Sequence, residues 1–402
     1  MKKRKLLALA LAGALSVGLL AGCSDGQKDP DPSSSQPVSG DKVIKIGVFE
    51  PASGDNGAGG KQETLGMKYA NSVCPTVEIN GETYTVELVP ADNQSSNDKA
   101  PSAAQTLISA GVSVVLGSYG SGVSIAASDI FGDAGVPAIG VTCTNPQVTA
   151  GNSHYFRICF LDPFQGTVLA NFAKQNSGAT KAYCLAKLGD DYSVGLCNYF
   201  MQAFGEENCV YETFPDGTSD YSSYVTNAKN NGCDVFFAPV STEAAALIID
   251  QAAAQDLGMP MLAGDTWDSN VVIEAAKGKS NIDLYVTTFY QEGGNTEFDE
   301  GFKAYLNSDS TAMSENGGND MIAAVSAMGY DAYFVALEAL KAAGSTDPAA
   351  VMAALPGVTY EGVSGAIAFD DVNGDAIRDA AYVKHCNTET AAWDFVAVQT
   401  ID

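Results

Sequence analysis

The alternation of short β-branched segments with Ala-rich segments constrains the fold of this chain more than any other feature of its sequence. The first series of predicted strands covers residues 43–49, 84–89, 112–116 and 136–141, with helices beginning near Gln62, Lys99 and Gly122. The second covers residues 181–185, 210–214, 234–238 and 260–262, with helices beginning near Phe164, Ser193, Tyr221 and Thr242. Such alternation, with short loops, predicts an α/β fold of two doubly wound, mainly parallel-sheet lobes.

The N-terminal segment has the pattern of a secretory signal. Residues 2–5 are basic, and the apolar run that follows is too short for a comfortable membrane span. Its end, Leu20-Ala21-Gly22-Cys23, resembles a bacterial lipoprotein cleavage site; an ordinary signal with an incidental cysteine is the alternative. We therefore expect a lipoprotein signal peptide over residues 1–22 and an extracytoplasmic protein anchored to the cell membrane by lipid on Cys23.

Residues 23–41 are rich in Ser, Pro, Gly and Asp and contain a single valine. This composition cannot bury enough apolar surface to order itself, so it predicts a disordered tether between anchor and folded body. The remaining length, about 360 residues, fits two lobes better than one core.

The charge balance excludes one class of partner. The chain has 21 Lys and Arg against 48 Asp and Glu, and four of the basic residues lie within the predicted signal. Nucleic-acid binding is excluded because the phosphates of a nucleic acid would repel a protein this acidic.

Eight cysteines follow Cys23, and an even number in an exported chain permits disulfides. Half of them lie in or beside apolar strand-like segments, and no Cys-x-x-Cys spacing occurs. We expect mostly free, buried thiols and leave disulfides as the alternative.

The loops that follow the strands of the first series are rich in glycine and hydroxyl groups. They are residues 51–60, residues 117–122 and residues 142–146. In open α/β sheets ligands bind beyond the carboxyl ends of strands, and a helix N-terminus offers N–H groups to an anion such as a carboxylate. Any one of these loops alone would be interpreted as a turn.

Enzymatic motifs are absent from the sequence. The only histidines are His154 and His385, and there is no Gly-x-Ser-x-Gly, so a hydrolase triad is disfavoured. The glycine-rich segment before Lys61 fails the phosphate-loop motif because Gln62 follows the lysine. Residues 370–375 look calcium-like, but a tight turn between strands over 366–369 and 380–383 explains them. We expect no catalysis, no cofactor and no metal.

The sequence Asp265-Thr266-Trp267-Asp268 follows the last strand of the second series. Its two carboxylates and an aromatic ring would suit an ammonium group. A helix N-cap at Asp268, Ser269 or Asn270 is the alternative, and both uses can coexist because the two carboxylates are distinct.

Read together, these loops resemble the branched-chain amino acid type of ABC-transporter substrate-binding proteins, with the type I periplasmic-binding-protein fold, over residues 45–398. The matching segments are residues 46–51 with Ser53-Gly54, Gly117-Ser118-Tyr119-Gly120-Ser121, Thr144-Asn145-Pro146, residues 155–157 leading to 162–166, Asp191-Tyr192-Ser193 with Gly195, and residues 264–269. Their order and spacing make the resemblance strong.

The resemblance implies a ligand carboxylate held around Ser121, Thr142 and Thr144, with Tyr119 a further candidate in the same loop. It also implies that Tyr192 and the acidic loop with Asp265, Trp267 and Asp268 close over the ligand from the second lobe. Two departures stand out: Pro239-Val240-Ser241 replaces a tyrosine of some members, and Thr266 stands where a glutamate often holds the ammonium. Asp265 is the expected substitute.

Family topology further implies three crossings between lobe 1, residues 42–161 plus 289–358, and lobe 2, residues 162–288 plus 359–402. The implied protein is a monomer that captures a small molecule, most simply an amino acid, and delivers it to an ABC permease in the membrane. A ligand-sensing receptor component, or a binder of an amide, peptide or nucleoside, is the alternative.

Overall fold

The computed structural model describes residues 42–401, and its first sheet has six strands in the order β2-β3-β1-β4-β5-β6. All neighbours run parallel except β2 and β3, which form an antiparallel pair. The strands are β1 Val43–Val48, β2 Thr76–Ile79, β3 Glu82–Pro90, β4 Val114–Leu116, β5 Ala138–Gly140 and β6 Tyr155–Arg157.

The second sheet has seven strands in the order β15-β14-β11-β10-β9-β7-β8. Its first five strands along the chain are parallel, and the C-terminal strands β14 and β15 add an antiparallel edge. The strands are β7 Ala182–Lys187, β8 Cys209–Phe214, β9 Val235–Phe237, β10 Met261–Ala263, β11 Leu284–Thr288, β14 Ala381–Asn387 and β15 Ala392–Gln399. A separate antiparallel pair joins β12 Thr359–Gly362 to β13 Gly365–Ala368.

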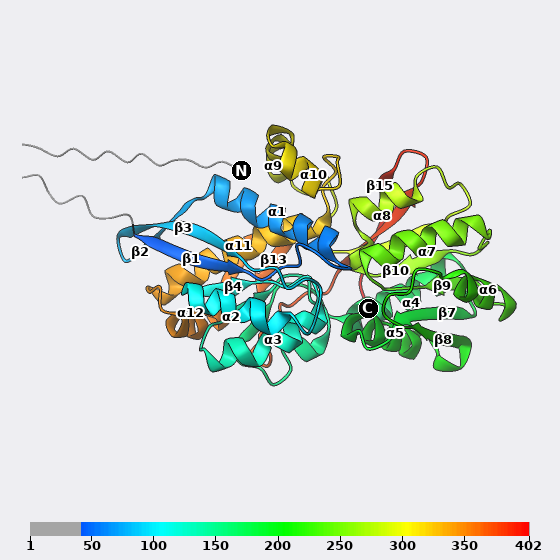
Figure 1. Cartoon of the computed structure of the whole chain (residues 1–402), viewed down its shortest axis with the longest axis horizontal. Helices are drawn as coiled ribbons and strands as arrows, with labels where there is room; N and C mark the ends of the chain where they lie inside the picture. Colours follow the sequence, from blue (N-terminus) through cyan, green and yellow to red (C-terminus); the bar gives the residue numbers. More distant parts are fainter. Residues whose placement is uncertain (1–41, 402) are drawn as a thin grey trace, which may run out of the picture. The chain divides into compact units, whose positions relative to one another are not determined.

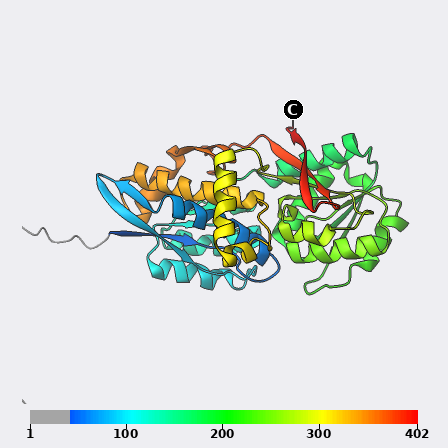
Figure 2. The same cartoon turned by 90° about the horizontal axis from the view of Figure 1, so that it is seen from above.

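Helices cover both faces of each sheet, which gives the two lobes of Figures 1 and 2. They are α1 Gly57–Val73, α2 Ala100–Ala110, α3 Ser121–Asp133, α4 Asp162–Asn176, α5 Asp191–Phe204, α6 Ser222–Asn230, α7 Thr242–Ala254, α8 Asn270–Ala276, α9 Thr296–Ser308, α10 Ser310–Glu315, α11 Ala324–Ala343 and α12 Pro348–Ala354. Short 3₁₀ helices lie at η1 Pro146–Val148, η2 Glu206–Asn208, η3 Asp265–Trp267 and η4 Leu355–Gly357.

Helices α1 and α11 cross at very short range, and this contact brings the late segment of the chain back to the first sheet. A Cβ on Gly66 would collide with the carbonyl of Ser326, and one on Gly329 would collide with the carbonyl of Glu63. Glycine at both points therefore lets the two backbones meet, as small residues do where helices pack closely.

Apolar packing shows where the chain passes between the lobes. Met328 and Leu337 of α11 share a buried cluster with Ile46 and Leu116 of the first sheet, whereas Val286 and Cys386 belong to a cluster of the second. The chain thus crosses after β6, after β11 and before β14, which confirms the expected two-lobed fold with three crossings. Residues 359–369 also pack on the first sheet, because Ile367 and Phe369 join its cluster. The lobe boundaries remain a proposal, and this packing favours a third boundary closer to β14 than residue 358.

All eight strands of the two predicted series are present within a few residues, as are the seven helices between them. The sequence did not predict β2, β6, β11, β12, β15 or the helices α9 to α12. The alternative helix start at residues 268–270 corresponds to α8, whose N-cap is Ser269. Residues 370–375 do form a turn, in which Asp370 Oδ1 accepts three backbone N–H groups. The strands on either side of it do not pair with each other, because β13 pairs with β12 and β14 with β11 and β15.

Within the described residues the eight cysteines after Cys23 are unpaired, and six of them are buried. The predicted signal peptide, tether and lipidated Cys23 lie outside the described residues. Across residues 42–401 we find no helix with the length and apolar character needed to cross a membrane.

Candidate functional site

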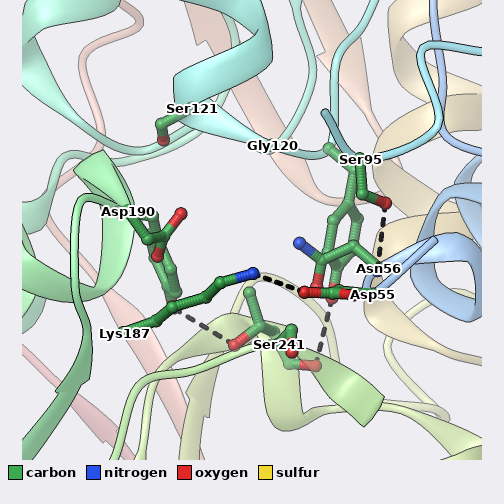
Figure 3. A pocket seen from close by; sticks show the side chains of 11 residues that line it. Asp55, Asn56, Ser95, Gly120, Ser121, Lys187, Asp190 and Ser241 are labelled. Atoms are coloured by element: carbon green, nitrogen blue, oxygen red, sulfur yellow. Dashed lines mark hydrogen bonds and ion pairs between the residues drawn. The ribbon is translucent and has the colours of Figure 1, made fainter. Parts of the chain in front are cut away.

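Loops from both lobes meet around one polar cavity with a volume of about 50 Å³ (Figure 3). Parallel strands present their carboxyl ends at the same edge of a sheet, so the loops after β1, β3, β4, β7, β9 and β10 all reach this point. The lining residues are Asp55, Asn56, Ser95, Tyr119, Gly120, Ser121, Lys187, Asp190, Tyr192, Ser241 and Thr266.

The lobe 1 side of the cavity offers hydrogen-bond donors. Ser121 is the first residue of α3 and is 1 % exposed, and its Oγ accepts the backbone N–H of Asn145 at 3.2 Å. Its hydroxyl hydrogen has no acceptor among the described residues, and the first N–H groups of α3 are free as at every helix start. This corner therefore suits an anionic group such as a carboxylate.

The loop that follows β5 is held in place by a buried ion pair behind the cavity. Arg157 donates from Nε to Asp375 Oδ1 at 2.8 Å and from Nη1 to the carbonyls of Cys143 and Asn145 at 2.8 and 2.6 Å. These contacts fix the backbone N–H of Asn145 against Ser121, so Arg157 positions the donor corner without lining it.

On the lobe 2 side a carboxylate acceptor, Asp265, lies directly behind the cavity lining. Asp265 Oδ1 accepts from Gln165 Nε2 at 3.0 Å and from the Tyr192 hydroxyl at 2.9 Å. The only other donor to this carboxylate within the described chain is the backbone N–H of Asp265 itself. Burial raises the pKa of Asp265 to about 6, although the bonds from Gln165 and Tyr192 oppose the shift. A carboxylate held with no cation beside it is suited to receive a cationic group of a ligand.

Direct hydrogen bonds join the two lobes around the cavity, so this arrangement is closed. Lys187 Nζ of lobe 2 lies 2.6 Å from Asp55 Oδ2 of lobe 1 (Figure 3). The Thr242 hydroxyl and the Glu243 N–H at the start of α7 donate to the Asp55 carbonyl at 3.1 and 3.2 Å. The Tyr119 hydroxyl donates to the Thr266 carbonyl at 3.1 Å.

Lys187 also lies 2.7 Å from Asp216 Oδ1. Burial opposes its charge, but the hydrogen bonds to Asp216 and Asp55 prevail and raise the pKa of Lys187. Its charge is therefore already balanced by two carboxylates.

Three of the eight predicted ligand-binding residues line the cavity: Tyr119, Ser121 and Tyr192. Asp265 lies directly behind the lining, bonded to Tyr192. The structure places Thr142 and Thr144 away from the lining and fully within lobe 1. Thr142 donates to Glu63 Oε2 at 2.5 Å.

Trp267 and Asp268 lie in the interior of lobe 2 and do not line the cavity. The ring of Trp267 is completely buried, and its Nε1 donates to the Val240 carbonyl at 3.0 Å. Asp268 Oδ2 accepts from Lys384 Nζ at 2.9 Å and from the Thr288 hydroxyl at 2.6 Å. The charge of Asp268 is therefore compensated within its own lobe.

Sequence reasoning missed most of the lining. Asp55 and Asn56 belong to a loop that the sequence singled out, but only as a glycine-rich segment. Ser95 follows β3, Lys187 is the last residue of β7 and Asp190 comes shortly after it, so extending the inspection of strand ends to these two strands would have found them. Ser241 and Thr266 were noted for other reasons, Ser241 in the segment that replaces a family tyrosine and Thr266 as the replacement of a family glutamate.

A pair of buried carboxyl groups lies behind the lobe 1 wall. Glu50 Oε2 accepts the backbone N–H of Tyr119 at 2.7 Å, and Glu63 accepts the hydroxyl of Thr142. Burial, reinforced for Glu50 by the adjacent Glu63, raises the pKa of Glu50 well above its usual range, and burial raises that of Glu63. Two adjacent buried carboxyls retain a proton between them, which explains how this wall tolerates both.

Comparisons with known proteins agree with this geometry. The family described as periplasmic binding protein matches residues 43–389. Over 240 residues the chain is 30 % identical to Leu/Ile/Val-binding protein homolog 1 of Brucella suis, a match that covers 58 % of this chain and 63 % of that protein. The match thus spans less than two thirds of that relative's length. An amino acid binding protein of Pseudomonas aeruginosa is 29 % identical over 253 residues, or 61 % of this chain and 67 % of that protein.

Among solved structures, a leucine binding protein (LivK) of Thermotoga maritima aligns with a TM-score of 0.77 and 32 % identity, covering 89 % of this chain and 99 % of that one. Its fold extends over both lobes and therefore over the cavity between them. The family match, the two mainly parallel sheets and the cavity between two lobes together establish that this chain belongs to the periplasmic binding protein family, with the type I fold.

Proposed function

We propose that this chain is an extracytoplasmic solute-binding protein that captures an amino acid between its lobes and delivers it to an ABC permease. The observation that carries the proposal is the polarity of the cavity. Hydroxyl and helix N-terminal donors at Ser121 lie on lobe 1, and the carboxylate of Asp265 lies on lobe 2. An α-carboxylate and an α-ammonium group need these two environments side by side.

The relatives support the same proposal. Proteins named as Leu/Ile/Val-binding, leucine-binding and amino-acid-binding share this family. The proteins compared are binding proteins and not enzymes, and we extend the absence of catalysis to this chain. We further propose that it acts as a monomer.

Titration calorimetry of the purified protein against the common L-amino acids tests the proposal. We expect at least one to bind with a heat change that disappears in Ser121→Ala and Asp265→Asn together. A folded protein that binds no amino acid would overturn it. Turnover of generic esters or amides would instead argue for an enzyme.

We also propose that Cys23 carries the lipid that holds the protein at the membrane. The proposal rests on the Leu20-Ala21-Gly22-Cys23 pattern and on the location that a periplasmic binding family implies. Such an anchor would place the cleft within reach of a membrane permease.

A further inference from the structure

We infer that the amino acid held in this cleft has a short, neutral, hydrogen-bonding side chain, of the serine, threonine or asparagine type, and not a branched aliphatic one. The inference rests on the proposed function and adds the class of side chain. It starts from what remains of the cavity once the Ser121 corner and Asp265 are assigned to the carboxylate and the ammonium.

The remaining lining carries many polar groups and no aliphatic side chain. Besides Gly120 and the rings of Tyr119 and Tyr192, the part not yet assigned consists of the polar residues Asp55, Asn56, Ser95, Lys187, Asp190, Ser241 and Thr266. A leucine or valine side chain placed there would remove water from these groups without replacing its hydrogen bonds. Such unreplaced hydrogen bonds are costly, which is why apolar ligands are found in apolar pockets.

Asn56 provides the most specific feature of this part of the cavity. It occupies the N-cap position of α1, where an asparagine normally bonds to the first turn, yet its side chain makes no capping hydrogen bond. Its backbone N–H is held by Ser95 Oγ at 3.0 Å, and its Oδ1 is buried with no partner among the described residues. The backbone of Asn56 is therefore held at the cavity wall, while its carboxamide makes no hydrogen bond to the described chain (Figure 3).

A second free group faces the same space from lobe 2. Ser241 caps α7 by accepting the N–H of Ala244 at 3.3 Å, and its own hydroxyl hydrogen has no acceptor in the described chain. Asn56 and Ser241 together supply a donor and an acceptor from opposite lobes, as a hydroxyl or carboxamide side chain requires.

The charges and the size of the cavity narrow the class further. Lys187 is balanced by Asp55 and Asp216, whereas Asp190 and Asp265 add negative charge, so an acidic side chain would be repelled. The closed cavity has little open space, about 50 Å³, which disfavours a long basic side chain. A compact, neutral, polar side chain remains.

The test compares affinities of the full chain for L-serine, L-threonine and L-asparagine with those for L-leucine, L-isoleucine and L-valine by calorimetry. We expect the best polar ligand to bind at least tenfold more tightly than the best branched one. If the branched ligands bind as tightly or more tightly, the side-chain inference is overturned while the proposed function stands. If neither group binds to folded protein, the side-chain inference fails, and the screen of all common L-amino acids then decides whether the proposed function stands.

Variants at Asn56 and Ser121 test which residue is responsible for the preference for polar over branched side chains. Asn56→Leu should weaken the polar ligands at least tenfold and reduce or reverse the preference, with Asn56→Ala as a second variant if the leucine disturbs folding. Ser121→Ala should weaken both groups of ligands by the same factor, because it faces the common carboxylate. The exposed Asn208→Leu is a matched control that should change neither. An unchanged preference in both Asn56 variants would contradict the inference.

Discussion

Replacing Asp265 by asparagine should make the empty protein more stable at neutral pH while it weakens ligand binding. The side chain is 1 % exposed, and burial is the main reason that its pKa rises from 3.8 to about 6. One pKa unit corresponds to about 1.4 kcal/mol, so the ionised carboxylate lowers the free energy of unfolding by about 3 kcal/mol. Asparagine avoids this cost and can still accept from Gln165 and Tyr192.

The pH dependence of this effect has a definite sign. Because the folded-state pKa of Asp265 is raised, the folded protein binds more protons than the unfolded chain between about pH 4 and about pH 6. The destabilising contribution is therefore complete above about pH 6 and is lost as the pH falls towards about 4. The stability difference between Asp265→Asn and the parent protein should fall over the same range.

Asp268→Asn is the matched control, since Asp268 is equally buried and only three residues away. It removes the partner of Lys384, which is 2 % exposed, and should therefore destabilise the protein by about 3 to 5 kcal/mol. Urea unfolding of the three ligand-free proteins between about pH 4 and about pH 8 measures both effects. The reasoning is refuted if Asp265→Asn is less stable than the parent at about pH 8, or if its advantage does not shrink on acidification.

Three further predictions concern closure and anchoring. Lys187→Met should weaken ligand binding by no more than about fivefold, because its partner Asp55 is partly exposed, and the loss should vanish in high salt; a larger or salt-independent loss would mean that Lys187 contacts the ligand. Small-angle scattering should give a smaller radius of gyration with a saturating amino acid, and no change would argue against a cleft that closes. Cys23→Ala should move the protein from the membrane to the soluble fraction, and continued membrane retention would refute the lipid anchor.

Local sequence patterns predicted the strands and helices that have a clear local composition. They missed elements whose structure depends on contacts with residues far away along the chain. Strand β6 has three residues and includes a fully buried arginine, which no local pattern marks as a strand. Arg157 is tolerated there because Asp375, far along the chain, lies 2.7 Å from its Nη2. Helix α11 was also not predicted. Its Gly329 lets it pack against α1, a contact with a distant part of the chain that the local sequence does not reveal.

The same limit applies to the cavity. Strand-end reasoning identified the loops after β1, β4 and β10 but not those after β3 and β7, and it could not tell which side chains of a loop face the cavity. Asp265, Thr266, Trp267 and Asp268 are consecutive, and the 3₁₀ turn η3 directs Thr266 to the cavity and Trp267 to the core. Asp268 is taken up by Lys384 from β14, a contact over 116 residues that sequence spacing does not encode.

The cost of burying Asp265 gives a physical reason for closure to depend on the ligand. Tyr119 of lobe 1 lies against the carbonyl of Thr266, so part of the covering of Asp265 comes from the opposite lobe. We expect water to reach the carboxylate when the lobes separate, which makes closure without a cation unfavourable. An α-ammonium group offsets this cost, and its carboxylate engages Ser121 on the other lobe at the same time. The share of this cost that depends on closure is the share by which the bound amino acid favours the closed state, about tenfold for each 1.4 kcal/mol. A ligand that lacks the amine could occupy the Ser121 corner without removing this penalty, and would therefore bind without compacting the protein.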